Sequence, residues 1–527
     1  MKHVALLLVL ALPLAAGDWS NNGGNAARNG LSDEVGPIAA DFLWTGGRPS
    51  IIAWQPMVAG RRVFVVRQTG FPPSGEPNGS PLVCMDLDTG AELWTVNVPF
   101  ATGDWTTFCL GTSNGQVYGS RSGNGGSVAR VFHAYDQATG AFLWSSVDTI
   151  DVGFYDGVVF APNGDLVIGN ATNVRRVAAL DGSTVWESPR VCNVTSSCGV
   201  ALFGNAVYVA EPAPGGNVVR RLDLATGAAG YQTPVMSGFT LQNTPFVGND
   251  GTLYLSRTQN NVATDFLFAF EDTGAALVPR WNRAAGWSTT SEWGTAPDGS
   301  VFLLAPDLRL EKLDPATGAT LATTANPIST AGGPSPHFAV DQSGKVFVSN
   351  GDFATGELFA FNPDLSFRWS LSVPNVNQGG PALGEDGTLV VAGIGTNIFA
   401  LRTTPLVAAS ATPRNAGANV DVLTSGLPIL GCTWSASLPD STQGHGFAAL
   451  LVVNGALDVP LASGQHLLVN AVAPAAFLDV QLAGAAEFAA PIPLDMALMG
   501  RDFYAQAAYV GGVPFQLTNA LDLILGG

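Results

Sequence analysis

The stretch Ala134-Tyr135-Asp136-Gln137-Ala138-Thr139-Gly140-Ala141-Phe142-Leu143-Trp144 decides the fold of this chain. It reads as the end of one strand, a tight turn and the start of the next strand. Asp136 is placed to accept backbone N–H groups inside the turn, and Gly140 supplies the left-handed backbone conformation that other residues resist. Phe142 and Trp144 stand two residues apart and so share one face of a strand. The stretch therefore predicts a β-hairpin.

The same hairpin returns along the chain. Close copies occur at residues 85–94, 222–231 and 313–321, and degenerate copies occur at 180–186, 270–281 and 361–369. The turns stand at positions 86, 136, 181, 223, 270, 314 and 362, so the steps between them are 50, 45, 42, 47, 44 and 48 residues. A period near 45 residues with strands throughout predicts a β-propeller, in which each repeat is one four-stranded blade.

The number of strong apolar strands sets the number of blades. Eight such strands lie around Val63, Val117, Leu166, Val207, Leu253, Val301, Val346 and Leu389. The last repeat, at residues 398–402, lacks the turn and the tryptophan strand, and the isolated strand at 42–44 supplies the missing piece. Closing the ring in this way removes open sheet edges. We predict an all-β, eight-bladed propeller over residues 18–405, with seven blades as the alternative.

The repeat pattern ends after Leu401. Residues 419–423, 447–453 and 477–482 read as strands between Gly and Pro turns, which predicts a small β-sandwich over residues 406–527. The closing segment, residues 501–523, resembles a C-terminal module found at the ends of secreted bacterial proteins. Such a module is either a sorting or attachment tag or a packing cap.

The N-terminus predicts export. Lys2 and His3 are followed by an apolar run over residues 4–14 and by the small residues Ala15-Ala16-Gly17, which is the pattern of a secretory signal peptide over residues 1–17. The apolar run is too short for a comfortable membrane span, and no later stretch offers about 20 apolar residues in a row. We expect a secreted protein, periplasmic or extracellular, without a membrane span.

Charge excludes one class of partner. The chain has 23 Lys and Arg against 41 Asp and Glu, a formal net charge of −18. Nucleic acids and anionic membrane surfaces need clustered cations on the protein, so we predict no nucleic-acid partner.

The five cysteines suggest disulfides in an oxidising compartment. Cys192 and Cys198 are predicted to close one loop, and Cys84 and Cys109, on sequential segments of one blade region, are a second possible pair. Cys432 is left over. The alternative is that some or all are small buried apolar residues. No Cys and His spacing resembles a zinc site, so no metal ligands are predicted.

A binding site is expected at one mouth of the central channel, where the loops between successive blades converge. Aromatic and amide side chains around such a funnel suit a planar or carbohydrate-like ligand, or a peptide. The alternative is that the aromatics seal the channel, the polar groups cap strand ends, and the one histidine among them is packed rather than an acid/base group. The predicted ligand-binding residues are Trp54, Trp105, Tyr155, Gln242, Trp293, His337 and Gln378, with Asp104, Asp156 and Glu292 beside them.

No catalytic residue is predicted. The aspartates that precede Thr-Gly in the repeat are tempting as acids, but their regular position marks them as turn-forming groups. They are Asp86, Asp136, Asp181, Asp223 and Asp314.

The Asp-x-x-Thr-Gly-x-x-x-Trp pattern of residues 136–144, together with the repeat length, resembles the pyrroloquinoline-quinone (PQQ) type β-propeller repeat over about residues 18–405. That repeat is shared by quinoprotein alcohol dehydrogenases and by the non-catalytic propeller of the outer-membrane protein assembly machinery. The enzymes carry an adjacent cysteine pair near the cofactor, whereas this sequence has neither Cys-Cys nor a Cys-x-x-Cys-His haem motif. The calcium ligands and catalytic aspartate of the enzymes are not matched residue by residue.

The resemblance therefore implies the non-catalytic branch: a secreted binding or scaffolding protein without a cofactor, whose partners are proteins or glycans. The alternative is a divergent alcohol or sugar dehydrogenase that uses PQQ with Ca²⁺.

Overall fold

The computed structural model describes residues 18–70, 79–101, 104, 106–122, 130–150, 157–191, 199–237, 244–257, 266–286, 294–328, 336–351, 356–373, 376, 379–403, 407–441, 443–482, 485–495, 498–511 and 515–527. The predicted signal peptide lies outside them. The described part is all-β, as the sequence predicts, with 3-10 turns as its helical structure, among them η2 (Glu385–Gly387).

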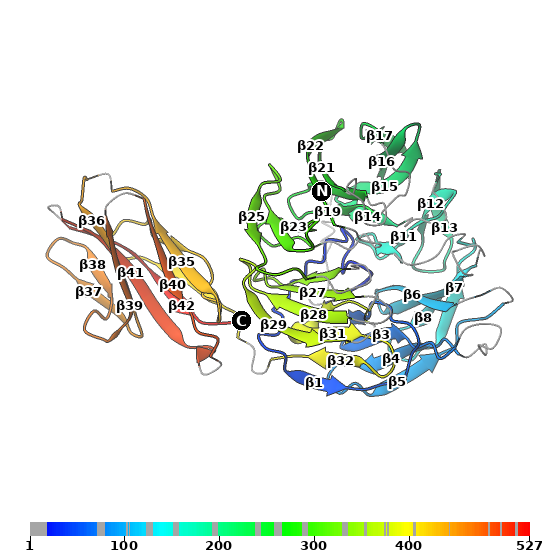
Figure 1. Cartoon of the computed structure of the whole chain (residues 1–527), viewed down its shortest axis with the longest axis horizontal. Coiled ribbons are helices and arrows are strands. Elements are labelled where there is room, and N and C mark those ends of the chain that lie inside the picture. Colours follow the sequence, from blue (N-terminus) through cyan, green and yellow to red (C-terminus); the bar gives the residue numbers. More distant parts are fainter. Residues whose placement is uncertain are drawn as a thin grey trace, which may run out of the picture.

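Residues 42–401 form eight antiparallel sheets arranged around a central axis (Figure 1). We take each sheet as one blade and number the blades in chain order. Blades one to four consist of β2 (Met57–Ala59), β3 (Arg62–Val66), β4 (Leu82–Asp86) and β5 (Glu92–Val96); β6 (Thr106–Ser113), β7 (Gln116–Ser122), β8 (Phe132–Asp136) and β9 (Phe142–Ser145); β10 (Val159–Phe160), β11 (Leu166–Gly169), β12 (Asn173–Val177) and β13 (Thr184–Pro189); and β14 (Val200–Phe203), β15 (Ala206–Ala213), β16 (Gly216–Asp223), β17 (Ala229–Gln232) and β18 (Met236–Ser237).

Blades five to seven consist of β19 (Phe246–Val247), β20 (Leu253–Arg257), β21 (Phe266–Asp272) and β22 (Leu277–Ala284); β23 (Val301–Leu304), β24 (Leu310–Leu313) and β25 (Thr320–Thr323); and β26 (His337–Val340), β27 (Val346–Gly351), β28 (Gly356–Phe361) and β29 (Phe367–Ser372). The eighth blade combines β30 (Ala382–Gly384), β31 (Thr388–Ala392) and β32 (Ile398–Leu401) with β1 (Phe42–Thr45) from the other end of the propeller sequence.

The ring is closed by that first strand. β1 pairs antiparallel with β32, with Phe42 opposite Leu401 and Trp44 opposite Ala400. The predicted pairing of the isolated strand with the final sheet is therefore confirmed, and Figure 1 shows β1 beside β32.

The repeated turn follows from its aspartate. In blade two, one carboxylate oxygen of Asp136 accepts the backbone N–H groups of Ala138 and Thr139 and the hydroxyl of Thr139, at 3.1, 2.8 and 2.7 Å. The corresponding aspartates at 86, 223 and 314 accept the same three bonds. At these positions the carboxylate builds the turn, as the sequence predicts.

The glycine and the tryptophan of the repeat join neighbouring blades. The indole N–H of Trp144 in blade two donates to the carbonyl of Ala179 at the turn of blade three, at 3.1 Å. A Cβ on Gly182 of that turn would come within 2.5 Å of the same indole. Four more tryptophans donate to the next blade and lie against its glycine in the same way, at positions 44, 94, 186 and 281. The repeat motif therefore encodes contacts between blades as well as a turn.

The central channel is filled by the N-terminal segment. Residues 19–32, which we call the plug, run once around the axis and form hydrogen bonds with the innermost part of every blade. In blade order, Trp19 exchanges two bonds with Val58, Ser20 accepts from Thr112, Asn21 donates to Val158, Ala26 accepts from Leu202, Ala27 from Val247, Asn29 from Thr295 and Gly30 from Val340, and Ser32 donates to Leu383. Figure 1 shows this dark blue segment inside the ring.

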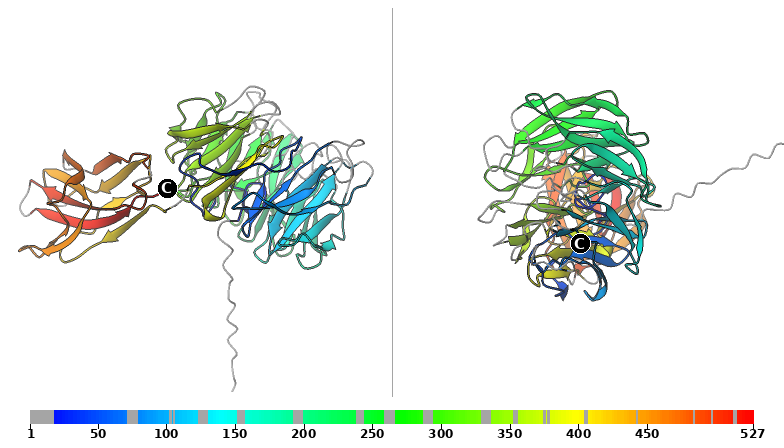
Figure 2. Two further views of the ribbon diagram at one scale, coloured as in Figure 1. Left: turned by 90° about the horizontal axis from the view of Figure 1, so that it is seen from below. Right: turned by 90° about the vertical axis from the view of Figure 1, so that its right-hand side faces the viewer.

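Residues 410–524 form three further sheets, which lie outside the ring as the orange and red strands of Figures 1 and 2. The five-stranded sheet contains β33 (Ser410–Arg414), β42 (Gln516–Ile524), β41 (Asp502–Val510), β36 (Phe447–Val453) and β39 (Ala475–Leu482), in that order. The other two contain β34 (Thr424–Ser425), β35 (Thr433–Leu438) and β40 (Ala486–Pro491), and β37 (Ala456–Pro460) with β38 (His466–Val469). We call this part the module. Its larger sheets share a core around Trp434, Leu450 and Leu521.

The module contacts the propeller at blade seven. Arg368 of β29 donates to the carbonyl of Leu430 at 2.9 Å, and Asn362 donates to the carbonyl of Gly431 at 3.1 Å. Ile38, Leu430 and Leu525 form a small buried cluster there. Specific contacts therefore connect the two parts of the chain.

The suggested pairing of Cys84 with Cys109 is wrong, because both are free thiols. Cys84 lies on β4 of blade one and Cys109 on β6 of blade two, so the connection after β5 separates them into neighbouring blades. Burial raises the pKa of each thiol to about 12. Cys432 is also free, and its thiol donates to Asn362 at 3.1 Å. Cys192 and Cys198 lie outside the described residues.

Candidate functional site

Two of the predicted channel-mouth residues are described, and both are packed. Trp54 is half-buried just before β2, with its ring centre 5.1 Å from that of Phe108. His337 begins β26 in blade seven and is 1% exposed. A Cβ on Gly380 would lie 2.2 Å from the Cβ of His337, so the backbone of the next blade approaches it closely. The remaining predicted residues, Trp105, Tyr155, Gln242, Trp293 and Gln378, with Asp156 and Glu292, lie outside the described residues.

Asp104, predicted beside the channel mouth, has a structural partner. One of its carboxylate oxygens lies 2.6 Å from Nε of Arg130, and the other accepts the backbone N–H of Ala101 at 2.6 Å. The Asp104 side chain has no solvent exposure. This carboxylate therefore ties the connection between blades one and two to the start of β8.

The plug is tightly packed along the channel axis. Arg28 is 4% exposed, and its guanidinium donates to the carbonyls of Val200 at 2.7 Å and Asn22 at 2.9 Å. Gly23 and Gly24 have φ values of +84° and +87°, and a Cβ on Gly24 would lie 2.9 Å from the ring of Trp19. The plug therefore packs against itself as well as against the blades, and it fills the channel at whose mouth a ligand site was predicted.

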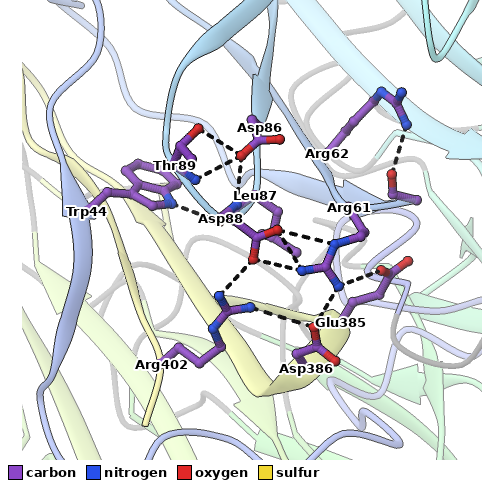
Figure 3. Close-up of polar contacts among 11 residues, drawn as sticks. Trp44, Arg61, Arg62, Asp86, Leu87, Asp88, Thr89, Glu385, Asp386 and Arg402 are labelled. Atoms are coloured by element: carbon purple, nitrogen blue, oxygen red, sulfur yellow. Dashed lines mark hydrogen bonds and ion pairs between the residues drawn. The ribbon is translucent and has the colours of Figure 1, made fainter. Parts of the chain in front are cut away.

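A charged network that the sequence did not reveal joins the first and last blades (Figure 3). Arg61, in the turn between β2 and β3, lies 2.6 Å from Asp88 and 2.6 Å from Asp386. Arg402, which follows β32, lies 2.7 Å from Asp88 and 3.7 Å from Asp386. These four side chains make a closed ring of alternating charge, and Glu385 adds a longer contact of 3.8 Å to Arg61. We call this ring of four the seam network.

Electrostatics agree with this pairing. The side-chain hydrogen bonds from Arg61 hold the pKa of Asp88 below its ordinary value, and those from Asp88 and Asp386 raise the pKa of Arg61. The Arg61 and Asp386 side chains are 47% and 58% exposed, so each pair contributes at most about 1 kcal/mol. The network can hold blades one and eight together, but its guanidiniums already bind carboxylates and are not free to bind a substrate.

A pocket of about 520 Å³ adjoins the seam network. Burial raises the pKa of Glu34 on its wall, and the nearby charges of Asp386 and Glu385 add to the effect. Its lining combines two guanidiniums, two carboxyls, an amide and a hydroxyl, which suit polar contacts with a ligand. The lining residues are Glu34, Val35, Arg61, Gln342, Asp386, Arg402, Thr403 and Ala408.

One sequence signal could have identified part of the network. Asp88 stands two residues after the turn aspartate, where the close copies have Ala138, Ala225 and Ala316. A charged side chain at a position that the turn itself does not need indicates another contact. Its partners, Arg402 and Asp386, come from the far end of the propeller sequence, and no local pattern identifies them.

The module carries an unusual surface. On the edge strand β39, Leu478, Val480 and Leu482 are 61, 54 and 78% exposed. The register places Asp479 of the same strand opposite the fully buried Leu450, so Asp479 shares the inner face with Phe477, which packs against the core, and Leu478, Val480 and Leu482 face outward. A sheet with one solvated face normally keeps its apolar side chains on the core side. An outward apolar row of this kind is typical of an interaction surface.

Two negative findings apply to the described residues. They contain no group of three or more His, Cys, Asp or Glu side chains arranged to hold a metal ion. Nor do they contain a helix with the length and apolar character needed to cross a membrane.

Comparison with known proteins places the repeat in a family. Residues 78–324 match the family model described as outer membrane protein assembly factor BamB, of the PQQ type. No curated protein matches the chain. This match supports a PQQ-type repeat over residues 78–324, as the resemblance of the hairpin motif implied.

Solved structures give distant similarities. BamB from Moraxella catarrhalis is 14% identical, with 67% of this chain and 95% of that chain covered and a TM-score of 0.46. A europium-containing methanol dehydrogenase is 14% identical, with 72% and 90% covered and a TM-score of 0.39. The C-terminal WD40 domain of Sif2 is 10% identical, with 69% and 98% covered and a TM-score of 0.47.

Proposed function

We propose that this protein is a secreted, non-catalytic β-propeller that binds a protein partner and acts as a scaffold outside the cytoplasm. The observation that carries the proposal is the plug, because residues 19–32 bond to all eight blades and take the channel axis. Because the plug occupies the axis, we expect the partner to bind to the outer surfaces of the protein. The leader over residues 1–17 supports export to the periplasm or the extracellular space.

The apolar row of β39 supports a protein as the partner. Leu478, Val480 and Leu482 offer side chains without polar atoms, which suit the apolar centre of a protein interface better than the hydroxyl groups of a glycan. The family match to a protein described as an assembly factor points the same way.

A second candidate is a divergent alcohol or sugar dehydrogenase with PQQ and Ca²⁺, which the PQQ-type repeat itself favours. The plug argues against this candidate, because in the described part of the chain residues 19–32 occupy the channel axis. The test is to incubate the purified full chain with PQQ and Ca²⁺ and to follow dye reduction with alcohols and sugars. We expect no turnover above the protein-free control, and turnover would overturn the proposal.

Partner binding is tested with one variant and one matched control. The immobilised full chain is exposed to the extracytoplasmic fraction of its source, a captured protein is purified, and its affinity is measured for each variant. Val480→Lys places a charge in the apolar row, and Leu321→Lys places one at a propeller residue of similar exposure, 54% against 57%.

We expect Val480→Lys to weaken binding about tenfold or more and Leu321→Lys to leave it unchanged. Equal affinity of both variants for the partner would show that β39 is not part of the interface. Retention of a defined glycan and of no protein would show that the proposed class of partner is wrong.

A further inference from the structure

The strand β39 leaves one edge of the module unpaired. Among the described strands it pairs with β36 only, at one end of the five-stranded sheet. The strand at the other end, β33, contains Pro413, and a proline without a backbone N–H is typical of edges that are protected against further pairing. β39 has the sequence Ala-Ala-Phe-Leu-Asp-Val-Gln-Leu over residues 475–482, without proline, lysine or arginine. This edge therefore lacks the usual protection against an added strand.

The backbone groups of the exposed apolar row point to that free edge. Both the N–H and the carbonyl of Ala507 on β41 bond to the hydroxyl of Thr518 on β42, at 3.1 and 3.0 Å, so Ala507 faces away from β36. Its register partner Leu450 consequently faces β39, where the ladder makes it the hydrogen-bonded partner of Asp479. Successive residues of a strand point their backbone groups in opposite directions, so those of Val480 point outward. In agreement with this, the N–H of Val480 donates to Oδ1 of Asp479, its neighbour on the same strand, at 2.9 Å.

The apolar row reads the same in both directions from Val480. Two antiparallel copies of β39, related by a two-fold axis at Val480, have Leu478 of each copy opposite Leu482 of the other and Val480 opposite Val480. All three residues point their backbone groups outward, so each opposed pair exchanges two N–H···O=C bonds. Their exposed side chains then lie together on one face, and Phe447 of β36, which is 44% exposed and opposite Leu482, extends that face. One register therefore satisfies the backbone groups and covers the apolar side chains.

The inner face of β39 selects the same register. Between the apolar pairs, Asp479 of one copy comes opposite Gln481 of the other, so a carboxylate meets an amide. Within one chain this amide already donates to Asp479, at 2.9 Å. A register centred one residue earlier would set Asp479 opposite Asp479, and directly opposed like charges are destabilising. A register centred one residue later would move Leu478 away from Leu482.

We propose that the module is a dimerisation element, in which the β39 strands of two copies of this chain pair antiparallel about Val480 and join their five-stranded sheets. The inference rests on the proposed function, because it names a second copy of the chain as a protein that the apolar row binds. Pairing uses the β39 edge of both copies, and the joined sheet ends on both sides in the proline-containing strand β33, so the assembly closes as a dimer. One strand pair is a small interface, and we expect reversible association with a Kd on the order of micromolar.

The first test is the mass of the full chain in solution, measured by sedimentation velocity from about 0.1 to about 100 μM. We expect a transition from monomer to dimer over this range. Val480→Lys places two like charges at the two-fold axis and should raise the Kd of the dimer about tenfold or more. Leu321→Lys, at a propeller residue of similar exposure, should leave the Kd unchanged. Far-UV circular dichroism checks that both variants are folded.

A second measurement locates the axis without adding charge. Opposed residues of a hydrogen-bonded antiparallel pair have Cα atoms about 5.5 Å apart, which is within the range that a disulfide spans. Val480→Cys should therefore give a covalent dimer under mild oxidation, seen by non-reducing electrophoresis. Leu321→Cys, oxidised in parallel, should remain monomeric.

A chain that stays monomeric up to about 100 μM would overturn the dimer and leave the proposed function standing, because that function requires only that some protein binds. A dimer that Val480→Lys does not weaken, or that Val480→Cys does not link, would also overturn the inference, since self-association would then use another surface. A dimer that depends on Val480, in a chain that captures no other protein, would support the inference and show that the proposed scaffold for a different partner is wrong.

Discussion

Replacing Gly227 with alanine tests the contact that joins blades three and four. Gly227 lies in the turn of blade four with a φ of +71°, and a new Cβ would stand 2.5 Å from Cε3 of Trp186 in blade three. The left-handed conformation costs an alanine about 1–2 kcal/mol. Forcing a methyl group into a packed contact costs about 1–3 kcal/mol more. We expect Gly227→Ala to lower the free energy of unfolding by about 2–5 kcal/mol.

Gly204 provides the matched control in the same blade. Its φ is +57°, and a Cβ there would meet no atom within 4 Å. Gly204→Ala should therefore cost only the backbone share, about 1–2 kcal/mol. Both variants are compared with the parent chain by equilibrium unfolding in urea, with tryptophan fluorescence and far-UV circular dichroism as probes. Equal losses for the two variants would refute the argument that the repeat glycine is required by the neighbouring indole.

Three further predictions concern a buried thiol and paired charges. Cys84, whose pKa burial raises to about 12, should resist alkylation at pH 8 in the native protein and react in urea, as mapped by mass spectrometry; native labelling would contradict its burial. Asp341→Ala leaves the fully buried ammonium of Lys345 without its partner at 2.9 Å, so urea unfolding should show a loss of about 3–5 kcal/mol, and a loss below 1 kcal/mol would contradict the pair. Asp88 pairs with both Arg61 and Arg402, so Asp88→Asn should lower the free energy of unfolding by at most about 2 kcal/mol near neutral pH and by nothing in acid. The reason is that a carboxyl with a lowered pKa contributes above about pH 4 and loses that contribution as the pH falls; a pH-independent cost in melting experiments would argue against the seam network.

The parts of the fold that depend on local chemistry were predictable. Asp136 and Gly140 specify the turn within five residues, and the same pattern recurs often enough to identify the propeller. The closing role of β1 was also predictable, because a tryptophan strand was missing at one end of the repeat and present at the other. Each inference uses a signal that is written in a short segment.

The parts that depend on distant segments were not predictable in the same way. Residues 18–30 read as a polar loop, since the plug has no regular period and takes its shape from the channel that it fills. The seam network joins Asp88 to Arg402 across almost the whole propeller sequence. Cys84 and Cys109 appeared close because they are near in sequence, but the chain moves to the next blade between them.

The repeated turn that blade eight lacks explains where the module attaches. Blade eight ends at β32 without the repeated turn, so Trp369 of blade seven has no such turn to contact and instead donates to the carbonyl of Ile38 at 3.1 Å. Arg368 donates to the same carbonyl at 3.1 Å and to Leu430 of the module at 2.9 Å. In place of the missing turn, Ile38, which precedes β1, and Leu430 of the module contact the last strand of blade seven. Ser32, the last residue of the plug, donates to Leu383 of blade eight, and the seam network joins the same blade to blade one. The blade that lacks the repeated turn is therefore held by contacts from the plug and from blade one.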